Sequence, residues 1–281
     1  MSVRIGLAVS GGGSEGPGTL FRLIDLCEDS AIDSLWFSER HISRQPSLKP
    51  MSVVAGRTER LKFGMNVVLL PFRDPLVLAN ECATLDYLSN GRLLPAFGVG
   101  GASSPEWRAI GLNPAGRGLL ADEMLQVMTA LWAGGTVDFA GKHFNYEDAS
   151  ISPLPVQQPL PAWIGGSSEG AIRRAALYGT GWLAGTQTPA EVAPVVAKIK
   201  AASAAAGGTI EEDHYGAGFP FRFGDWDDPI VQKSLTGYQR AGADPQNLLA
   251  VGNADVIVAR VQDYISVGVS KFVLRAPRSG R

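Results

Sequence analysis

Short apolar runs alternate with segments of helical periodicity along the whole chain. Strands are expected at or within Val3–Val9, Ser34–Phe37, Leu61–Leu70, Leu93–Gly98, Ala162–Ile164, Trp182–Ala184, Tyr215–Phe223 and Lys271–Arg275. Between them apolar residues recur at offsets of 3, 4 and 7, as in Leu20, Leu23 and Cys27, which is the spacing of one helix face. Strands that alternate with helices in this way are typical of a parallel sheet.

Capping residues indicate where two of the helices begin. Asp74 followed by Pro75 predicts a helix start, because Asp accepts from free N–H groups and Pro lacks the N–H that would stay unpaired. Thr188 and Glu191 have the spacing of a capping box. Pro194 follows closely, and we expect it to disturb the second turn of that helix.

Eight strand–helix units in 281 residues fit a parallel (β/α)8 TIM barrel better than an open doubly wound sheet. The glycine-rich stretch Gly11–Gly16 lacks the acidic residue of a dinucleotide-binding turn, since Asp33 precedes the next strand instead of ending it. Neither a linker nor an internal repeat divides the chain, so residues 1–281 are predicted to form a single α/β domain. Insertion segments are expected at the C-terminal face of the barrel. They include a hairpin around Gly141, and lids are expected over 141–161 and 211–228.

Composition narrows the class of protein. Hydrophobic residues make up 45% of the chain, which supplies a large core and excludes a disordered protein. The formal net charge of −2 disfavours a broad surface for nucleic acid or an anionic membrane. Cys27 and Cys82 both lie in apolar helical patterns, which argues against a disulfide framework. Because the chain has no 18-residue apolar run and no signal-peptide pattern, we expect a cytoplasmic protein.

Glycine is the one residue type in clear excess. The chain has 34 glycines, well above the average usage of about 7%. Three groups of them follow predicted strands: Gly11–Gly13, Gly98–Gly101 and Gly165–Gly166. Since the active sites of such barrels lie at the C-terminal ends of the strands, these glycines are interpreted as room for a flat cofactor.

The turn after the fifth strand has the most explicit chemistry. Gly165 and Gly166 permit close backbone approach, and Ser167 and Ser168 then open a helix whose free N–H groups favour an anion. Arg173 and Arg174, one turn later, are candidates to add positive charge. The pattern fits a phosphate-binding turn, but it also fits an ordinary serine-capped helix.

The end of the second strand carries an acid, a cation and an imidazole: Glu39, Arg40 and His41. A histidine there suits proton transfer because its ordinary pKa is near 6.5. Alternatively, Glu39 pairs with Arg40 and His41 is a half-buried structural residue. The three histidines are too far apart in sequence to predict a metal site.

Taken together, stretches along nearly the whole chain resemble the luciferase-like monooxygenase family of flavin- and deazaflavin-dependent oxidoreductases. In chain order they are Asp33–Phe37 with Glu39 and His41, Leu61–Gly64, Leu70–Pro71, Leu85–Arg92, Gly98–Gly100, Gly141–Phe144, Trp163–Ser167 and Tyr178–Trp182. Each stretch alone is a weak signal, but their common order is specific.

The resemblance implies a flavin at the barrel mouth, with its phosphate at Ser167 and Ser168, and so favours the phosphate-binding interpretation of that turn. It also implies a non-proline cis peptide near Asn66 or Val67, and a homodimer. The cofactor-binding residues expected on this basis are Asn66, Gly98, Gly100, Gly101, Gly165, Gly166, Ser167 and Ser168.

The resemblance further implies a monooxygenase that uses O2 and reduced FMN, supplied by a separate reductase, to oxidise a small organic substrate. His41, Arg40 and Glu39 are the expected catalytic residues. Many members carry histidine where this chain has Arg40, and an arginine cannot act as a base at neutral pH.

Two alternatives stay open. One is hydride transfer with the deazaflavin coenzyme F-420 and without O2, for which Arg40 and Arg117 would favour the anionic tail of the cofactor. The other is a relative that keeps the barrel but binds no cofactor.

Overall fold

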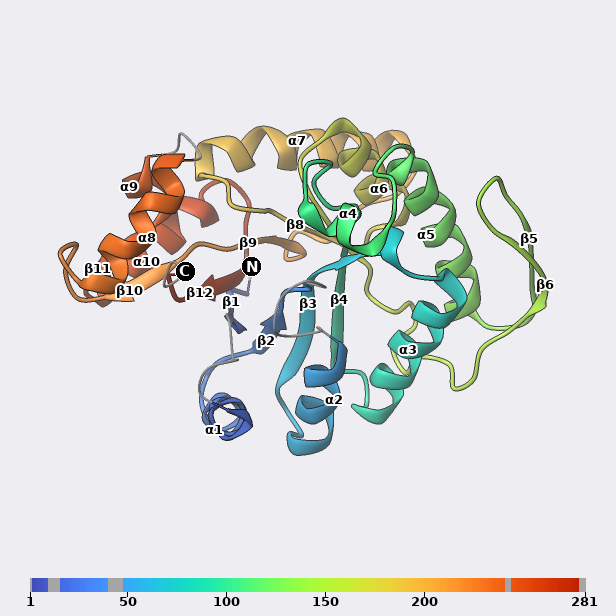
Figure 1. The fold of residues 1–281 in the computed structure, drawn as a ribbon, viewed down its shortest axis with the longest axis horizontal. Helices are drawn as coiled ribbons and strands as arrows, with labels where there is room; N and C mark the ends of the chain where they lie inside the picture. The colour runs from blue at the N-terminus through green and yellow to red at the C-terminus, as the bar shows by residue number, and fades with distance from the viewer. Residues whose placement is uncertain (1, 10–15, 40–47, 241–243, 278–281) are drawn as a thin grey trace.

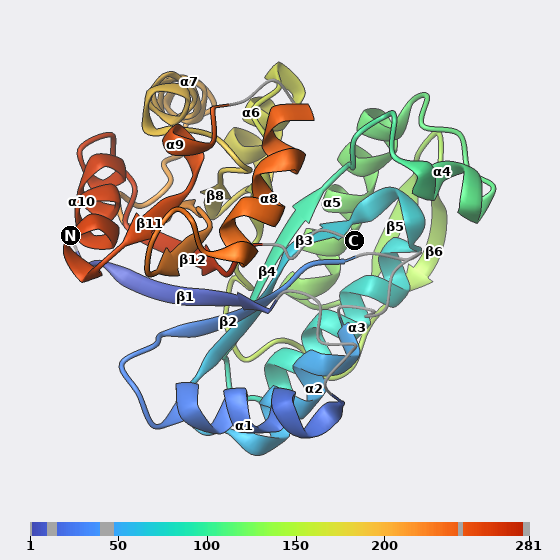
Figure 2. The same ribbon diagram turned by 60° about the vertical axis from the view of Figure 1, so that its left-hand side comes forward.

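The computed structural model describes residues 2–9, 16–39, 48–240 and 244–277. Eight parallel strands close into a barrel in the order β1-β12-β9-β8-β7-β4-β3-β2 (Figures 1 and 2). The barrel strands are β1 (Arg4–Val9), β2 (Ser34–Phe37), β3 (Lys62–Leu69), β4 (Leu93–Gly98), β7 (Trp163–Gly165), β8 (Gly181–Leu183), β9 (Tyr215–Ala217) and β12 (Lys271–Arg275). The predicted (β/α)8 TIM barrel is therefore confirmed, and all eight predicted strand regions contribute a barrel strand.

The seventh predicted strand region is divided between two sheets. Only β9 belongs to the barrel, whereas β10 (Phe221–Phe223) pairs in parallel with β11 (Ala250–Gly252) outside it. A small separate core that includes Val231 and Leu249 packs beside this second sheet. The segment expected to form a lid over 211–228 thus contains both a barrel strand and part of this second sheet.

Helices lie around the barrel strands and in the connections between them (Figure 1). They are α1 (Pro17–Glu28), α2 (Leu48–Arg57), η1 (Leu70–Phe72), α3 (Pro75–Leu88), α4 (Pro105–Ile110), α5 (Arg117–Ala133), α6 (Glu169–Tyr178), α7 (Pro189–Ala205), α8 (Pro229–Arg240), α9 (Pro245–Leu248) and α10 (Ala254–Ile265). Asp74 caps α3 as predicted, since its carboxylate accepts from the N–H groups of Leu76 and Val77 at 2.9 and 3.1 Å.

Pro194 does not end the helix, because α7 continues through it to Ala205. Both halves of the predicted capping box between Thr188 and Glu191 are present. A proline at this position removes one backbone hydrogen bond, to the carbonyl of Ala190. The cap and the buried apolar face of the helix outweigh that loss.

A hairpin of β5 (Val137–Ala140) and β6 (Asn145–Ala149) follows α5, at the predicted position around Gly141. Figure 1 shows it projecting beyond α5, on the outer flank of the molecule. The carboxylate of Glu123 accepts from the backbone N–H groups of residues 142–144, and the hydroxyl of Tyr146 donates to Asp74. This part of the expected lid is thus attached to the outer helices.

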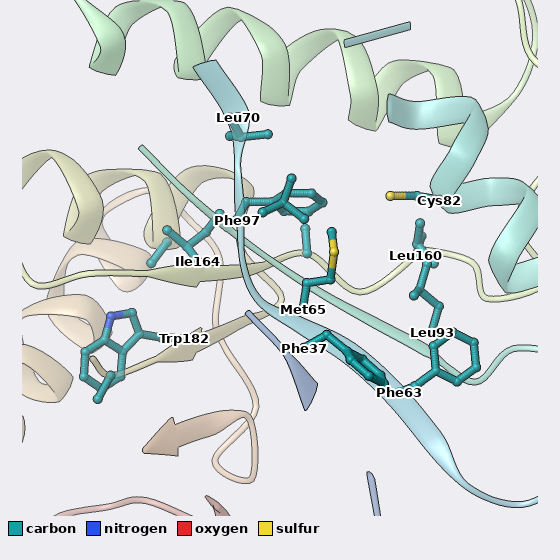
Figure 3. Packing of buried hydrophobic residues seen from close by; sticks show 14 of the residues in the cluster. Phe37, Phe63, Met65, Leu70, Cys82, Leu93, Phe97, Leu160, Ile164 and Trp182 are labelled. Carbon is teal, nitrogen blue, oxygen red and sulfur yellow. The ribbon is translucent and has the colours of Figure 1, made fainter. Parts of the chain in front are cut away.

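The larger part of the core lies between the strands and the helices. Phe37, Met65 and Phe97 come from three neighbouring strands and gather on the side that faces the helices, opposite Cys82 of α3 (Figure 3). Cys27 and Cys82 are both buried free thiols, in agreement with their interpretation as core residues.

Two tryptophans fill the inside of the barrel. The rings of Trp36 and Trp163 meet edge to face with their centroids 6.4 Å apart. Glycines on the neighbouring strands leave the space for them: a Cβ on Gly181 would lie 2.7 Å from the Trp163 ring, and one on Gly64 would lie 2.9 Å from the Trp36 ring. Part of the glycine excess is therefore explained by the barrel interior and not by turns.

Candidate functional site

The mouth of the barrel, where the strands end, has a floor of apolar side chains. Trp36, Ala96, Trp163, Leu183 and Val273 form a cluster inside the barrel, and Val67 packs against it. Gly98 and Gly165 end two adjoining strands above this floor. A Cβ on either glycine would lie 2.8 Å from a methyl group of Val67, so these two glycines make room for Val67.

The peptide bond between Asn66 and Val67 is cis, at the place that the resemblance implies. The pairing of β3 with β4 is also irregular there: Asn66 is opposite Ala96 and Val68 is opposite Phe97, so Val67 is an extra residue in β3. This bulge directs Val67 toward the two glycines. Asn66 itself is half-buried.

The loop after β4 turns at a glycine, and its carbonyl groups accept hydrogen bonds from two side chains of the helices that follow. Gly100 has φ +69°, which favours glycine, and its carbonyl accepts from the Arg117 guanidinium at 3.2 Å. The Gly101 carbonyl accepts from the indole N–H of Trp107 at 2.9 Å. A Cβ on Gly101 would meet nothing within 4 Å, so the space beside Gly101 is open.

Two hollows adjoin this loop. An open groove of about 400 Å³ is lined by Ala102, Ser103, Ser104, Pro105, Trp107, Arg108, Leu112 and Pro114. A second cavity, of only about 10 Å³, lies against Gly98, Gly165 and Arg174, which is space for about one water molecule. The groove is large enough for part of a small organic molecule.

The turn between β7 and α6 contains a glycine in the left-handed region, and α6 begins after Ser168. Gly166 has φ +106°, and Ser167 and Ser168 are both exposed. The hydroxyl oxygen of Ser168 accepts from the N–H of Ala171 at 3.2 Å, which leaves the hydroxyl proton for another acceptor. The serine cap and an anion-binding turn are therefore compatible here.

Arg173 and Arg174, which the sequence suggested as additional positive charge, both pair with Asp122 of α5. Arg174 also donates to the carbonyl of Gly118 at 2.8 Å. One carboxylate between two guanidinium groups leaves a net positive charge beneath α6, but these hydrogen bonds are directed at Asp122 and Gly118.

Of the three expected catalytic residues, Arg40 and His41 lie outside the described residues. Glu39 is buried: one carboxylate oxygen accepts from the N–H of Leu69 at 2.6 Å, and the other accepts from the guanidinium of Arg73. Glu39 therefore contacts the end of β3 and the residue that follows η1.

Two charged residues near the mouth were missed from the sequence. Glu106 is buried, and Ser104 donates to its carboxylate at 3.2 Å; in sequence it has the position of an ordinary first-turn acid, which carries no signal. Arg275 ends β12, on the same side of the strand as Lys271 and Val273. The sequence predicted the strand at Lys271–Arg275, but not which of its two sides faces the barrel interior.

Within the described ranges, no group of three or more His, Cys, Asp or Glu residues is placed to hold a metal ion. None of the described helices is both long and apolar enough to span a bilayer.

The fold is shared with solved flavin and deazaflavin enzymes. An F-420-dependent secondary alcohol dehydrogenase in complex with an F-420–acetone adduct superimposes with a TM-score of 0.85 at 18% identity, over 99% of this chain and 94% of the other. The coenzyme F-420-dependent tetrahydromethanopterin reductase of Methanopyrus kandleri gives 0.83 at 20% identity, over 99% and 95%. The oxygenating constituent of 3,6-diketocamphane monooxygenase of Pseudomonas putida, in complex with FMN, gives 0.79 at 17%, over 99% and 92%.

Sequence relatives are more similar over a shorter length. An uncharacterized protein of Mycobacterium tuberculosis is 33% identical over 153 residues, and so is one of Mycobacterium bovis. Each alignment covers 54% of this chain and 52% of the relative, so the chain spans about half the length of the curated relatives it matches. Residues 2–255 match the model of the luciferase-like monooxygenase family. The chain therefore belongs to the luciferase-like monooxygenase family.

Proposed function

We propose that this protein is a flavin-dependent monooxygenase that uses reduced FMN and O2 to oxidise a small organic substrate at the barrel mouth. One observation supports this most: an apolar floor, made of the partly exposed Val67 packed on the buried Trp36 and Trp163, lies beside the serine-capped turn that begins α6. A flat aromatic ring system and a phosphate need these two surfaces next to each other.

The residues present fit such a cofactor. Ser168 has a hydroxyl proton to donate, and the first turn of α6 offers backbone N–H groups to an anion. Gly166 has a positive φ, so its backbone conformation requires glycine, and the missing side chain leaves the turn accessible. We propose Asn66, Gly98, Gly100, Gly101, Gly165, Gly166, Ser167 and Ser168 as the residues around the cofactor.

Bound FMN would supply the electrons and the site at which O2 reacts. The chain's own residues would orient the ring, exclude water and hold protons. The floor around Trp36 and Trp163 excludes water from below. His41 is proposed to hold or move the proton, and Arg40 to stabilise negative charge. Glu39 is proposed to act through β3, because its carboxylate is bonded to Leu69 and Arg73.

Three further parts of the proposal concern the protein in its cell. A separate reductase supplies the reduced FMN, the protein is cytoplasmic, and it forms a homodimer.

A second candidate function is hydride transfer with coenzyme F-420. The names of two of the similar structures given above include that cofactor. Arg117, which was expected to favour an anionic cofactor tail, lies beside the mouth and donates to the carbonyls of Gly100 and Pro114 at 3.2 and 3.1 Å. This reaction would need no O2.

Fluorescence titration of the purified protein with FMN, riboflavin and coenzyme F-420 tests the proposal. We expect FMN to bind more tightly than riboflavin, because only FMN has a phosphate. Ser168→Ala should weaken FMN binding about 10- to 100-fold, as expected for one hydrogen bond to a charged group, and should leave riboflavin binding nearly unchanged.

Thr188→Ala is the matched control, because it removes the cap of α7 instead of α6. Both substitutions should cost about 1 kcal/mol of stability, but only Ser168→Ala should discriminate between FMN and riboflavin. Tight binding of F-420 alone would replace the monooxygenase proposal with the hydride-transfer one. If none of the three ligands binds, both proposals are wrong and a barrel without a cofactor remains.

A further inference from the structure

Arg275 lies at the end of the last barrel strand, on the interior side. In β12, Lys271 is fully buried and Val273 belongs to the cluster inside the barrel, whereas Phe272 and Leu274 pack against the outer core. Alternation along a strand places Arg275 on the same side as Lys271 and Val273. The regular pairing of β12 with β1, in which Ala8 is opposite Arg275, excludes a bulge that would reverse this side.

Arg275 lies across the mouth from β4. In the closed ring of eight strands β12 and β4 are four places apart, so Arg275 is opposite Gly98. The proposed phosphate-binding turn follows β7, which is three places from β12. Arg275 thus lies on the side of the mouth away from the β3–β4 bulge.

The charge of Arg275 has no carboxylate partner in the described part of the chain. Its guanidinium donates to the hydroxyl of Thr186 at 2.9 Å, which is a neutral acceptor. By contrast, Arg4, Arg73 and Arg222 each form an ion pair with an Asp or Glu. The Thr186 contact uses one of the five N–H donors of an arginine and holds the side chain along the rim after β8.

We propose that Arg275 binds a carboxylate group on the substrate. A guanidinium presents a planar pair of N–H donors that matches a carboxylate, and a half-buried cation at an apolar floor gains from such a partner. The substrate class is then a small organic acid, whose apolar part lies over Ala8 and Val67, partly exposed residues that pack against the interior cluster, while its carboxylate contacts Arg275. This assignment rests on the proposed function. If the cofactor phosphate lies at the turn after β7, the substrate lies on the side of the mouth that Arg275 occupies.

Labelling of arginines by phenylglyoxal, followed by mass spectrometry, tests the contact directly on the whole protein. We expect benzoate to slow the labelling of Arg275 several-fold, and benzyl alcohol, the neutral molecule of similar shape, to have no effect. Arg22 is exposed on α1, a helix that lies outside the barrel strands (Figure 2), so benzoate should leave its labelling unchanged.

Calorimetry with two variants completes the test. Arg275→Met should weaken benzoate binding about 10- to 100-fold, the range for a hydrogen-bonded charge, and Arg275→Lys should recover part of it. Arg22→Met, which removes the same charge elsewhere, should bind benzoate like the wild type. Equal benzoate affinity in Arg275→Met and in the wild type would overturn the proposal.

The cofactor phosphate is the other anion that Arg275 could bind, and the same variants distinguish the two. If Arg275→Met weakens FMN binding but not riboflavin binding, Arg275 contacts the cofactor and the substrate assignment is wrong. If benzoate protects Arg275 but neither FMN nor F-420 binds the protein, the carboxylate site stands and the proposed function fails.

Discussion

Glu39 is the expected catalytic residue whose surroundings are described, and they indicate a positioning role. Both oxygens of its buried carboxylate are acceptors, one for the Leu69 N–H and one for Arg73. Arg73 also approaches the carboxylate of Glu81 at 3.6 Å. A carboxylate engaged in this way would orient the end of β3, two residues beyond Val67.

Glu39→Gln is therefore expected to loosen the end of β3. The variant keeps the size of the side chain but loses the charge that faces Arg73, which should cost about 1.5–3 kcal/mol of unfolding free energy. Hydrogen exchange, followed by mass spectrometry, should accelerate in peptides covering residues 66–72 and remain unchanged in β1 and β12.

Asp25→Asn is the control, because the ion pair of Asp25 with Arg57 is exposed and should contribute little to stability. Unchanged exchange at residues 66–72 in Glu39→Gln would contradict the positioning role.

The same residues show what the sequence could predict about the site. Gly98, Gly165 and Glu39 could be assigned to strand ends from the alternation of apolar runs, because that pattern is local. That Val67 fills the space beside both glycines, or that Arg73 pairs with Glu39, depends on the register between strands distant in sequence. Local patterns carry no information on that register.

At the scale of the strands, glycine has a role that composition alone could not show. The interior of this barrel is filled by two tryptophans, and several neighbouring strands carry glycine where a side chain would meet their rings or a facing backbone. The spacing of apolar residues identified these segments as strands. Their glycines, however, were assigned only to turns or to a cofactor site, so those that make room for side chains inside the barrel were missed.

Gly64→Ala should consequently prevent normal folding or destabilise the protein severely. A Cβ there would collide with the carbonyl oxygen of Leu94 in β4 and lie 2.9 Å from the Trp36 ring, and a barrel strand cannot move without displacing its neighbours. Soluble yield and thermal unfolding are the measurements.

Gly56→Ala, in α2, is the matched substitution, because nothing lies within 4 Å of a Cβ there. It should stabilise the protein by about 0.5–1 kcal/mol, as expected for alanine in place of glycine in a helix. A Gly64→Ala protein as stable as the wild type would show that the interior packing described here is wrong.

At the scale of the whole molecule, an ion pair links β12 to the start of β2, the two strands that lie on either side of β1 in the closed barrel. Lys271 of β12 pairs with Asp33, which precedes β2, and its ammonium lies 5.8 Å from the centre of the Trp36 ring. Burial lowers the pKa of Lys271 to about 8, with smaller contributions from the cations of Lys62 and Arg4, although Asp33 opposes the shift. Burial raises the pKa of Asp33, but the charge and hydrogen bond of Lys271, together with smaller contributions from Lys62 and Ser34, outweigh it and the net shift is downward.

These shifts predict how stability depends on pH. Because Lys271 binds its proton less tightly when folded, stability should rise between about pH 8 and pH 10.5, by at most about 1.4 kcal/mol per pH unit. Asp33 contributes stability above its unfolded pKa of about 3.9, and this contribution is lost as the pH falls below that value.

Urea unfolding of the wild type and of Lys271→Met at pH 7, 8, 9 and 10 measures the alkaline part. The stability difference between the two should shift in favour of the wild type above pH 8. Lys198→Met, which removes an exposed ion pair with Glu169, should show a constant difference. A constant difference for Lys271→Met as well would contradict the prediction.

The pairing of β1 with β12 also has a consequence for synthesis on the ribosome. Arg4 is opposite Lys271, so one edge of the first strand gains its partner only after nearly the whole chain has been made. At about 5–20 residues per second, translation takes on the order of tens of seconds to reach that point. During this time the nascent chain exposes an unpaired strand edge, which is prone to pair with other chains. The pairing of β1 with β12 removes that edge.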